Sequence, residues 1–299
     1  MGSSNSLKVL SLLIVLGVLG STLGVVRTAA VPFKMIQVEE SVSGSGSAGS
    51  GSLAVAVFFS VSDSKGAGAF SGTLTDRAFT QEKDAIFSLN TETSPLIPVL
   101  QCGPAPEVEA TGTVISGSFL GEQVLVASCI GTGVPGAFII YHSTPSNPDF
   151  SGQGTGTAAV LSGSFKGGIA AAGVTSGSGS TGSGTIYTAE ANGITKDGTL
   201  IGGGAFVGTI SDHPVGTTWV TNRASVQSGC TLTTSGVAAS FGSFPNQPVS
   251  SSYTLVTCPP ASSGSQTARF VYVIGGDTSP IYKGTGSALI ELFAFLAER

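Results

Sequence analysis

The chain has 299 residues, a formal net charge of −5 and only 10% charged residues. Soluble proteins usually carry about 25% charged residues, so the polar surface here must come from Ser, Thr, Gly and backbone groups. The sequence contains no basic run, which excludes nucleic acid as an expected partner, because phosphate binding needs clustered Lys and Arg. Hydrophobic residues make up 41% and are spread along the chain, which excludes a disordered protein.

The N-terminus has the pattern of a secretory signal peptide. Lys8 precedes an apolar run over 9–20, and small residues at 28–30 offer a cleavage site after Ala30. An uncleaved membrane anchor ending at Val26 is the alternative, but Gly, Ser and Thr interrupt it and it falls short of about 20 strongly apolar residues. We therefore expect residues 1–30 to be removed, leaving a secreted or cell-surface protein without a transmembrane span.

The remaining chain reads mainly as β-strands. Runs of β-branched and aromatic residues bounded by Gly, Pro, Ser or Asn occupy 52–62, 112–121, 122–129, 136–143 and 268–275. Residues 80–89 and 288–298 are the only candidates for helices, and by analogy with the first half of the chain the latter is predicted to be a strand. Seven to nine antiparallel strands per half indicate a barrel or a sandwich, and glycines beside strand starts favour a closed barrel.

Several segments recur at an offset of about 132 residues, which predicts an internal duplication. "SGSGSAGSG" at 43–51 returns as "SGSGSTGSG" at 176–184, and "GAFSGTLTD" at 68–76 returns as "GAFVGTISD" at 204–212. The copies are expected to be two abutting domains, 31–163 and 164–299. The string at 43–51 contains the G-x-G-x-x-G pattern of a phosphate-binding loop. Such a loop is followed by a helix, whereas a strand-like run follows this string. It is therefore interpreted as an internal loop or a Gly-rich strand entry.

The four cysteines fit this division. Cys102 and Cys129 fall in the first copy, and Cys230 and Cys258 in the second, at nearly equal spacing. Four cysteines allow three connectivities. Duplication selects one disulfide in each copy, 102–129 and 230–258, which implies an oxidising compartment. No zinc site is expected, because there is no C-x-x-C and no His near any Cys.

One hairpin permits a comparison with known families. Phe138-Ile139-Ile140 and the following 149–165, "DFSGQGTGTAAVLSGSF", resemble the hairpin of allene-oxide-cyclase-like and dirigent-like barrels. Residues 269–293 are similar, so the resemblance covers about 30 residues in each copy. It implies an eight-stranded barrel around a small apolar ligand, and in dirigent proteins a cofactor-free coupling of radicals. None of the families' functional residues matches a position here, and the tandem arrangement and paired disulfides depart from their pattern.

Candidate chemical groups are few. Asp76 and Asp212 form the only acidic pair at equivalent positions of both copies. Each could act as a general acid, a general base or a cation ligand. The alternative is that each carboxylate caps a turn. His142 and His213 fall at different places in the repeat, so no site shared by both copies depends on them. No nucleophile elbow, P-loop or metal-binding motif is present, so no catalytic residue, metal or cofactor is predicted.

Three functions fit these observations. The favoured one is a non-enzymatic structural or interaction protein of a cell surface, matrix or filament, which self-associates or binds surface components through exposed strand edges. The alternative is a barrel that holds a small apolar ligand in a cavity. The third is a cofactor-free enzyme that resembles a cyclase or a dirigent protein.

Overall fold

A computed structural model describes residues 35–60, 64–90, 102, 104, 107–142, 146–163, 165–227, 231–239, 252–258, 267–276 and 279–294. All of them belong to one compact unit, Lys34–Arg299. Within these ranges no helix is long and apolar enough to cross a membrane. The predicted signal peptide, 1–30, lies outside the described residues and stays a prediction.

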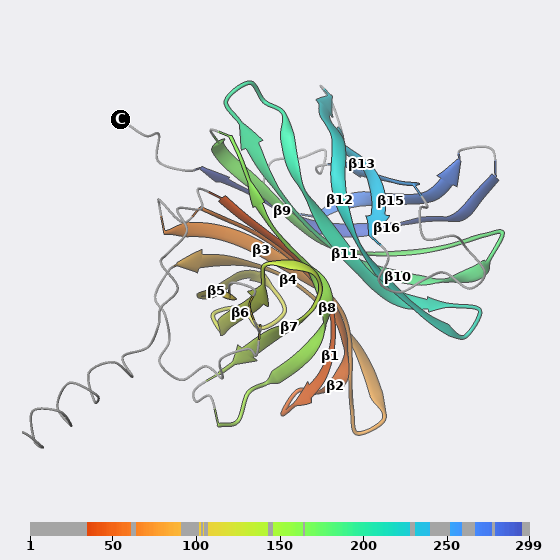
Figure 1. The fold of residues 1–299 in the computed structure, drawn as a ribbon. Helices are drawn as coiled ribbons and strands as arrows, with labels where there is room; N and C mark the ends of the chain where they lie inside the picture. Colours follow the sequence, from red (N-terminus) through yellow and green to blue (C-terminus); the bar gives the residue numbers. More distant parts are fainter. Residues whose placement is uncertain are drawn as a thin grey trace, which may run out of the picture. The chain divides into compact units, whose positions relative to one another are not determined.

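The first eight strands form a closed antiparallel barrel, in which each strand pairs with the next and the last pairs with the first (Figure 1). The strands are β1 (Met35–Gly46), β2 (Gly49–Ser60), β3 (Lys65–Asp76), β4 (Phe79–Asn90), β5 (Glu107–Gly117), β6 (Gln123–Cys129), β7 (Gly131–Tyr141) and β8 (Phe150–Leu161). The expected all-β fold with an eight-stranded antiparallel barrel is confirmed, and the sandwich alternative is wrong.

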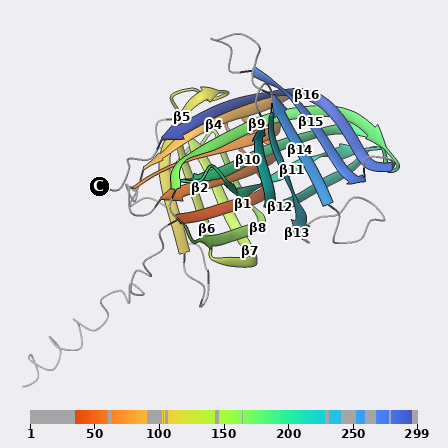
Figure 2. The same cartoon turned by 90° about the horizontal axis from the view of Figure 1, so that it is seen from above.

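Strands β9 to β16 are ordered in the same way, and β16 pairs back with β9 to close the circuit; Figure 2 shows these strands from a second direction. They are β9 (Phe165–Gly179), β10 (Gly182–Thr195), β11 (Leu200–Ile210), β12 (His213–Gln227), β13 (Thr231–Ala239), β14 (Ser252–Cys258), β15 (Thr267–Gly276) and β16 (Ser279–Ala294). The duplication and its domain limits, 31–163 and 164–299, stay predictions.

The two segments that resembled helices are both strands. Residues 80–89 lie in β4, so the helical interpretation is wrong there. Ala85, Phe87 and Leu89 are buried at every second position, and β4 pairs with both β3 and β5. Sheet pairing on two sides therefore overrides the weak helical periodicity. The predicted strand at the C-terminal end is confirmed for its described part, which ends with β16.

The repeated glycine-rich string forms a tight hairpin in each half. Gly46 pairs with Gly49 across a two-residue turn, and Gly179 pairs with Gly182 across another. Gly49 and Gly182 adopt φ angles of 119° and 118°, which favour glycine. The interpretation as an internal loop or strand entry is confirmed, and no helix follows that would bind a phosphate.

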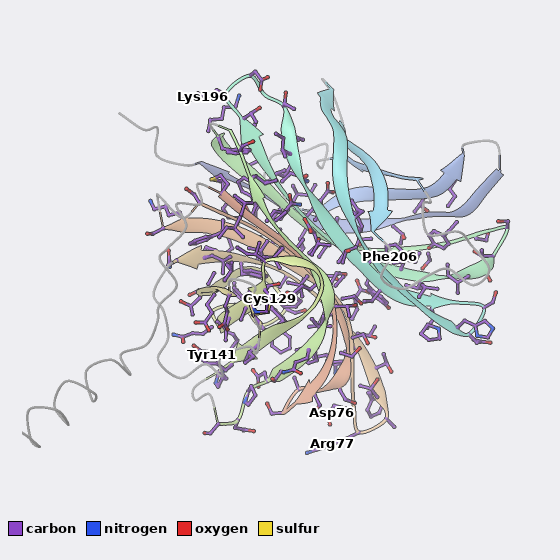
Figure 3. All side chains as sticks on the ribbon, viewed as in Figure 1. Asp76, Arg77, Cys129, Tyr141, Lys196 and Phe206 are labelled. Atoms are coloured by element: carbon purple, nitrogen blue, oxygen red, sulfur yellow. A yellow bond between two sulfur atoms is a disulfide. The ribbon has the colours of Figure 1, made fainter. Side chains whose placement is uncertain are left out.

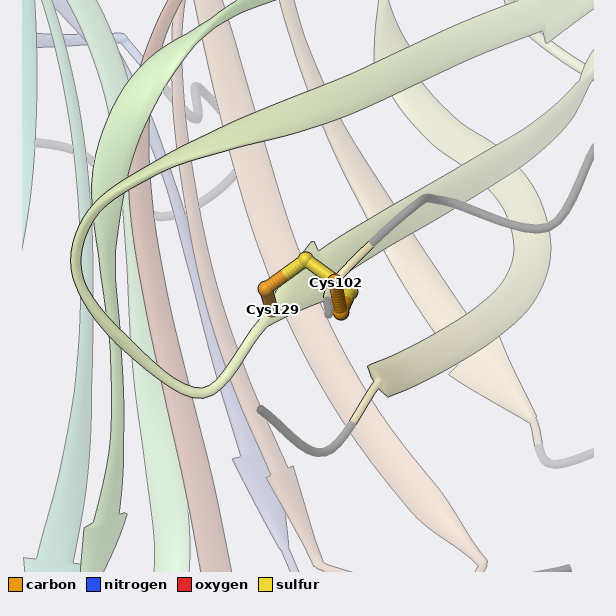
Figure 4. The surroundings of a disulfide bond; sticks show 2 residues. All are labelled: Cys102 and Cys129. Atoms are coloured by element: carbon orange, nitrogen blue, oxygen red, sulfur yellow. A yellow bond between two sulfur atoms is a disulfide. The ribbon is translucent and has the colours of Figure 1, made fainter. Parts of the chain in front are cut away.

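The predicted disulfide between Cys102 and Cys129 is present, with a Cα–Cα distance of 5.5 Å. It joins the segment before β5 to the end of β6 (Figure 4). Cys230 lies outside the described residues, so the bridge between Cys230 and Cys258 stays a prediction.

Phenylalanine rings fill the described interior of the first barrel. The ring centroids of Phe70 and Phe138 are 5.4 Å apart, and those of Phe138 and Phe150 are 6.4 Å apart. Phe87 stacks with Phe70 at 6.3 Å. The four rings come from β3, β4, β7 and β8, so they tie strands across the barrel through a packed aromatic core.

A layer of alanines joins the two barrels. On β2, valines face the phenyl rings, whereas Ala54 and Ala56 belong to a buried cluster that contains residues of both barrels. Phe58 extends this cluster, packing edge-on against Phe165 with centroids 5.1 Å apart. Small side chains let two sheets approach closely, so the alternation of Val and Ala on β2 serves two cores at once. The other alanines of the cluster are Ala67, Ala69, Ala170, Ala172, Ala189, Ala191 and Ala205.

A candidate site between the two barrels

Strand β1 carries two consecutive buried carboxyl groups. Glu39 is 1% exposed and Glu40 is 0% exposed. Because successive side chains of a strand point to opposite faces, the two groups enter different environments. Glu40 is opposite Val55, inside the first barrel, whereas Glu39 is opposite Ala56, on the face that packs against the second barrel. Burial raises the pKa of Glu40 to about 8, partly offset by the Ser128 hydroxyl.

The Glu39 side chain extends from β1 and contacts residues of β8 and β11. The Thr157 hydroxyl donates a hydrogen bond to its Oε2. Its Oε1 and the Gln37 Nε2 both lie over Gly203, where a Cβ atom would be 2.6 and 2.7 Å from them. Only glycine leaves room for this approach. Among the described residues, neither Oε1 nor Nε2 makes a hydrogen bond of regular geometry, although the adjacent Gln37 side chain lowers the pKa of Glu39.

The environment of Glu39 keeps its carboxyl group neutral. Burial raises its pKa to about 8, the Thr157 hydroxyl lowers it, and the nearby Glu40 raises it further. At neutral pH the group is therefore protonated and can donate a hydrogen bond, as a carboxylate cannot. A buried polar group with an unused oxygen is costly unless a partner or ligand satisfies it.

A pocket of about 270 Å³ opens along the same junction. The first barrel contributes a wall of hydroxyl groups, in which the Oγ atoms of Ser43 and Ser52 are 2.7 Å apart. The second barrel contributes an opposite wall that is mostly apolar. The lining residues are Ser41, Ser43, Ser52 and Thr155 on one side, and Val207, Gly208, Pro214, Val215 and Gly216 on the other.

Glu39 continues the polar wall inward. Thr155 is paired with Ser41, and Thr157 is paired with Glu39, so the two pairs are successive rungs on one face of the sheet. Two residues along a strand span about 7 Å. The Glu39 carboxyl group thus lies one residue pair beyond Ser41 and Thr155, which line the pocket. It stands at the inner end of a row of hydroxyl groups.

A partly buried carboxyl group, that of Asp84, lies on the face of the first barrel that meets the second. Ser71 Oγ lies 2.5 Å from Asp84 Oδ1 and 2.9 Å from the carbonyl oxygen of Gly173 on β9. Burial, followed by Glu82, raises the pKa of Asp84 to about 8. A protonated Asp84 can donate to Ser71, which then donates to Gly173, so the chain of bonds links the two barrels.

The carboxylates predicted from the sequence lie elsewhere. Asp76 ends β3 at a hairpin tip, with 53% of its side chain exposed and Arg77 Nε at 3.9 Å (Figure 3). Asp212 is the exposed second residue of the turn between β11 and β12, with φ 64°. The two hairpins close at different points, so the turn positions of the two residues are not equivalent. Neither lines the pocket, and their binding role stays a prediction.

Glu39 and the serines beside it were not among the residues predicted from the sequence. The available signal was the pair of adjacent glutamates in 35–46, inside an apolar and hydroxyl-rich run of a chain with few charges. A carboxyl group in such a strand must be buried or face a partner. Which face each glutamate takes depends on the barrel-to-barrel packing, which periodicity alone does not reveal.

No protein-family model and no curated protein matches the chain. Two solved structures match over most of their length, at low structural similarity. One is a putative AttH from Nitrosomonas europaea, with 10% identity, a TM-score of 0.23, and coverage of 88% of this chain and 93% of that one. The other is kievitone hydratase from Nectria haematococca, with 6% identity, a TM-score of 0.23, and coverage of 90% and 94%. The resemblance to allene-oxide-cyclase-like and dirigent-like proteins stays a prediction, although the eight-stranded barrel that it implies is present.

Proposed function

We propose that the chain is a secreted protein that binds a small uncharged molecule between its two barrels. The observation that carries the proposal is the pocket at the junction, with a wall of hydroxyl groups facing an apolar wall and the buried Glu39 behind it. The disulfide between Cys102 and Cys129 is compatible with an extracellular, oxidising environment.

The lining favours a particular ligand chemistry. Ser41, Ser43, Ser52 and Thr155 can donate or accept hydrogen bonds along one edge of a ligand. Val207 and Val215 suit a hydrocarbon face. Among the described residues, no charged side chain lines this pocket, so an uncharged ligand with oxygen atoms on one side fits best. The volume of about 270 Å³ lies just below the range of drug-sized sites, which favours a small compound.

This proposal replaces association through strand edges as the preferred mechanism. In both barrels the described strands pair on two sides, so no free edge is offered to another molecule. A surface, matrix or filament role then requires contacts between side chains. Size-exclusion chromatography of the mature protein over a range of concentrations tests that role, and a concentration-dependent shift to larger species would favour it.

The binding experiment uses a library of uncharged, oxygen-containing fragments and the thermal unfolding of the protein. Fragments that raise the unfolding temperature are then titrated calorimetrically into the parent, Thr155→Trp and Gln153→Trp. Both positions are exposed on the same face of β8, but only Thr155 lines the pocket. We expect Thr155→Trp to abolish binding and Gln153→Trp to preserve it. Equal binding by all three proteins would contradict the proposed site.

A further inference from the structure

A cluster of potential metal ligands lies at one end of the first barrel, apart from the pocket. Glu122 precedes β6, His142 follows β7 and Asp149 precedes β8. The imidazole nitrogen and one carboxylate oxygen of each acid all lie within 4.8 Å of one another. His142 Nδ1 hydrogen-bonds Glu122 Oε1. Up to 27 residues separate these ligands in the sequence, so no short motif marks them.

The backbone holds the two acids in place. The Glu122 amide donates to Phe119 at 2.9 Å, and its carbonyl accepts from Val114 at 2.9 Å. The Asp149 carbonyl accepts from the Ala48 amide at 3.0 Å, in the turn of the glycine-rich hairpin. Ser47 Oγ donates to Asp149 Oδ1 at 2.5 Å. The two acids are thus fixed by the β5–β6 and β1–β2 hairpins before any ion arrives.

The charges at this place are unbalanced. Two carboxylates converge, and in the described part of the chain His142 is the only basic group within ion-pair distance of Glu122. The His142 side chain is 69% exposed, whereas that of Glu122 is 16% exposed. An ion can therefore enter from solvent, and the imidazole has room to turn toward it.

We propose that Glu122, His142 and Asp149 form a binding site for a divalent transition metal such as Zn²⁺. One imidazole nitrogen and two carboxylate oxygens are a donor set that Zn²⁺ accepts, with water in the fourth position. Tetrahedral ligands about 2.1 Å from the metal lie about 3.4 Å apart. Metal binding must therefore replace the hydrogen bond between His142 and Glu122 and separate their two atoms, and the exposed His142 supplies most of the movement. The metal ties the β5–β6 turn to the β7–β8 connection.

The test is a calorimetric titration of Zn²⁺ into the metal-free mature protein. The visible absorption of bound Co²⁺ is a second readout. His142→Ala and Asp149→Asn remove ligands, and His213→Ala is the matched control, because His213 is the other histidine and is exposed on the second barrel. Circular dichroism of the metal-free variants checks that each one folds, and His142→Gln replaces any variant that does not.

We expect one equivalent of Zn²⁺ to bind the parent and the His213→Ala variant alike. Loss of a ligand should weaken binding at least about tenfold and remove the Co²⁺ absorption. The absence of binding by the parent, unchanged binding by the His142 variants, or an equal loss in His213→Ala would overturn the proposal. Fragment binding at the pocket between the barrels is a separate measurement, so either proposal can fail alone.

Discussion

Replacing Glu39 by Gln should remove the part of the pH dependence of stability that comes from this one carboxyl group. The side chain keeps its size and its acceptor for Thr157, but it cannot ionise. In the parent, the folded state retains the Glu39 proton up to about pH 8, whereas the unfolded chain releases it near 4.5. Between these values the folded state binds more protons, so the free energy of unfolding falls as the pH rises.

The size of this effect follows from the burial of Glu39. Its pKa rises from 4.5 to about 8 on folding, and each pKa unit corresponds to about 1.36 kcal/mol. The parent should therefore lose up to about 5 kcal/mol through this group between pH 4.5 and pH 8. Glu40 and Asp84 remain in both proteins, so the difference between parent and Glu39→Gln isolates Glu39.

The assay is urea unfolding of the mature protein at several pH values from 4.5 to 8.5. We expect the two proteins to be similar at the acidic end and Glu39→Gln to be the more stable at the alkaline end. Asp76→Asn is the control, because it removes a half-exposed carboxylate at a hairpin tip. If parent and Glu39→Gln lose stability in parallel as the pH rises, the buried, neutral state of Glu39 is refuted.

Three further substitutions test the packing. Replacing Cys102 and Cys129 together by Ser should cost about 3 to 4 kcal/mol in urea unfolding, from the loop of 27 residues that the bridge closes, and reduction of the parent should reproduce this loss. Ala56→Leu overfills the layer between the barrels and should cost about 1–3 kcal/mol, whereas Val160→Leu at an exposed position should cost far less. Gly49→Ala should lower the thermal midpoint, because φ is 119° and the new Cβ would lie 2.6 Å from the Thr75 carbonyl oxygen; an unchanged midpoint would contradict the turn geometry.

Much of the fold was predictable because it depends on local patterns. Alternating β-branched residues mark the strands, and the glycine-rich string marks a turn that needs a positive φ at Gly49. The recurrence of two cysteines at nearly equal spacing in each half indicated the disulfide between Cys102 and Cys129. Residues 80–89 were ambiguous, because their charged and apolar residues fit the periodicity of either a helix or a strand. Only the pairing with β3 and β5 decides for a strand.

The candidate site was not predictable, because it depends on how the barrels pack. Ser41, Glu39 and Thr157 are neighbours only through the pairing of β1 with β8. The apolar wall comes from β11 and β12, and Gly203 accommodates Glu39 from more than 160 residues away. Asp76 and Asp212 recur in similar stretches of sequence, yet a recurring residue at a hairpin tip carries little information about a pocket formed between two barrels.

The most direct test of the proposed binding site is a crystal structure of the protein with a fragment that stabilises it. We expect the fragment to lie between the barrels, with its oxygen atoms toward Ser41, Ser52 and Thr155 and its hydrocarbon face toward Val207 and Val215. A fragment found among Phe70, Phe138 and the other rings inside the first barrel would contradict it.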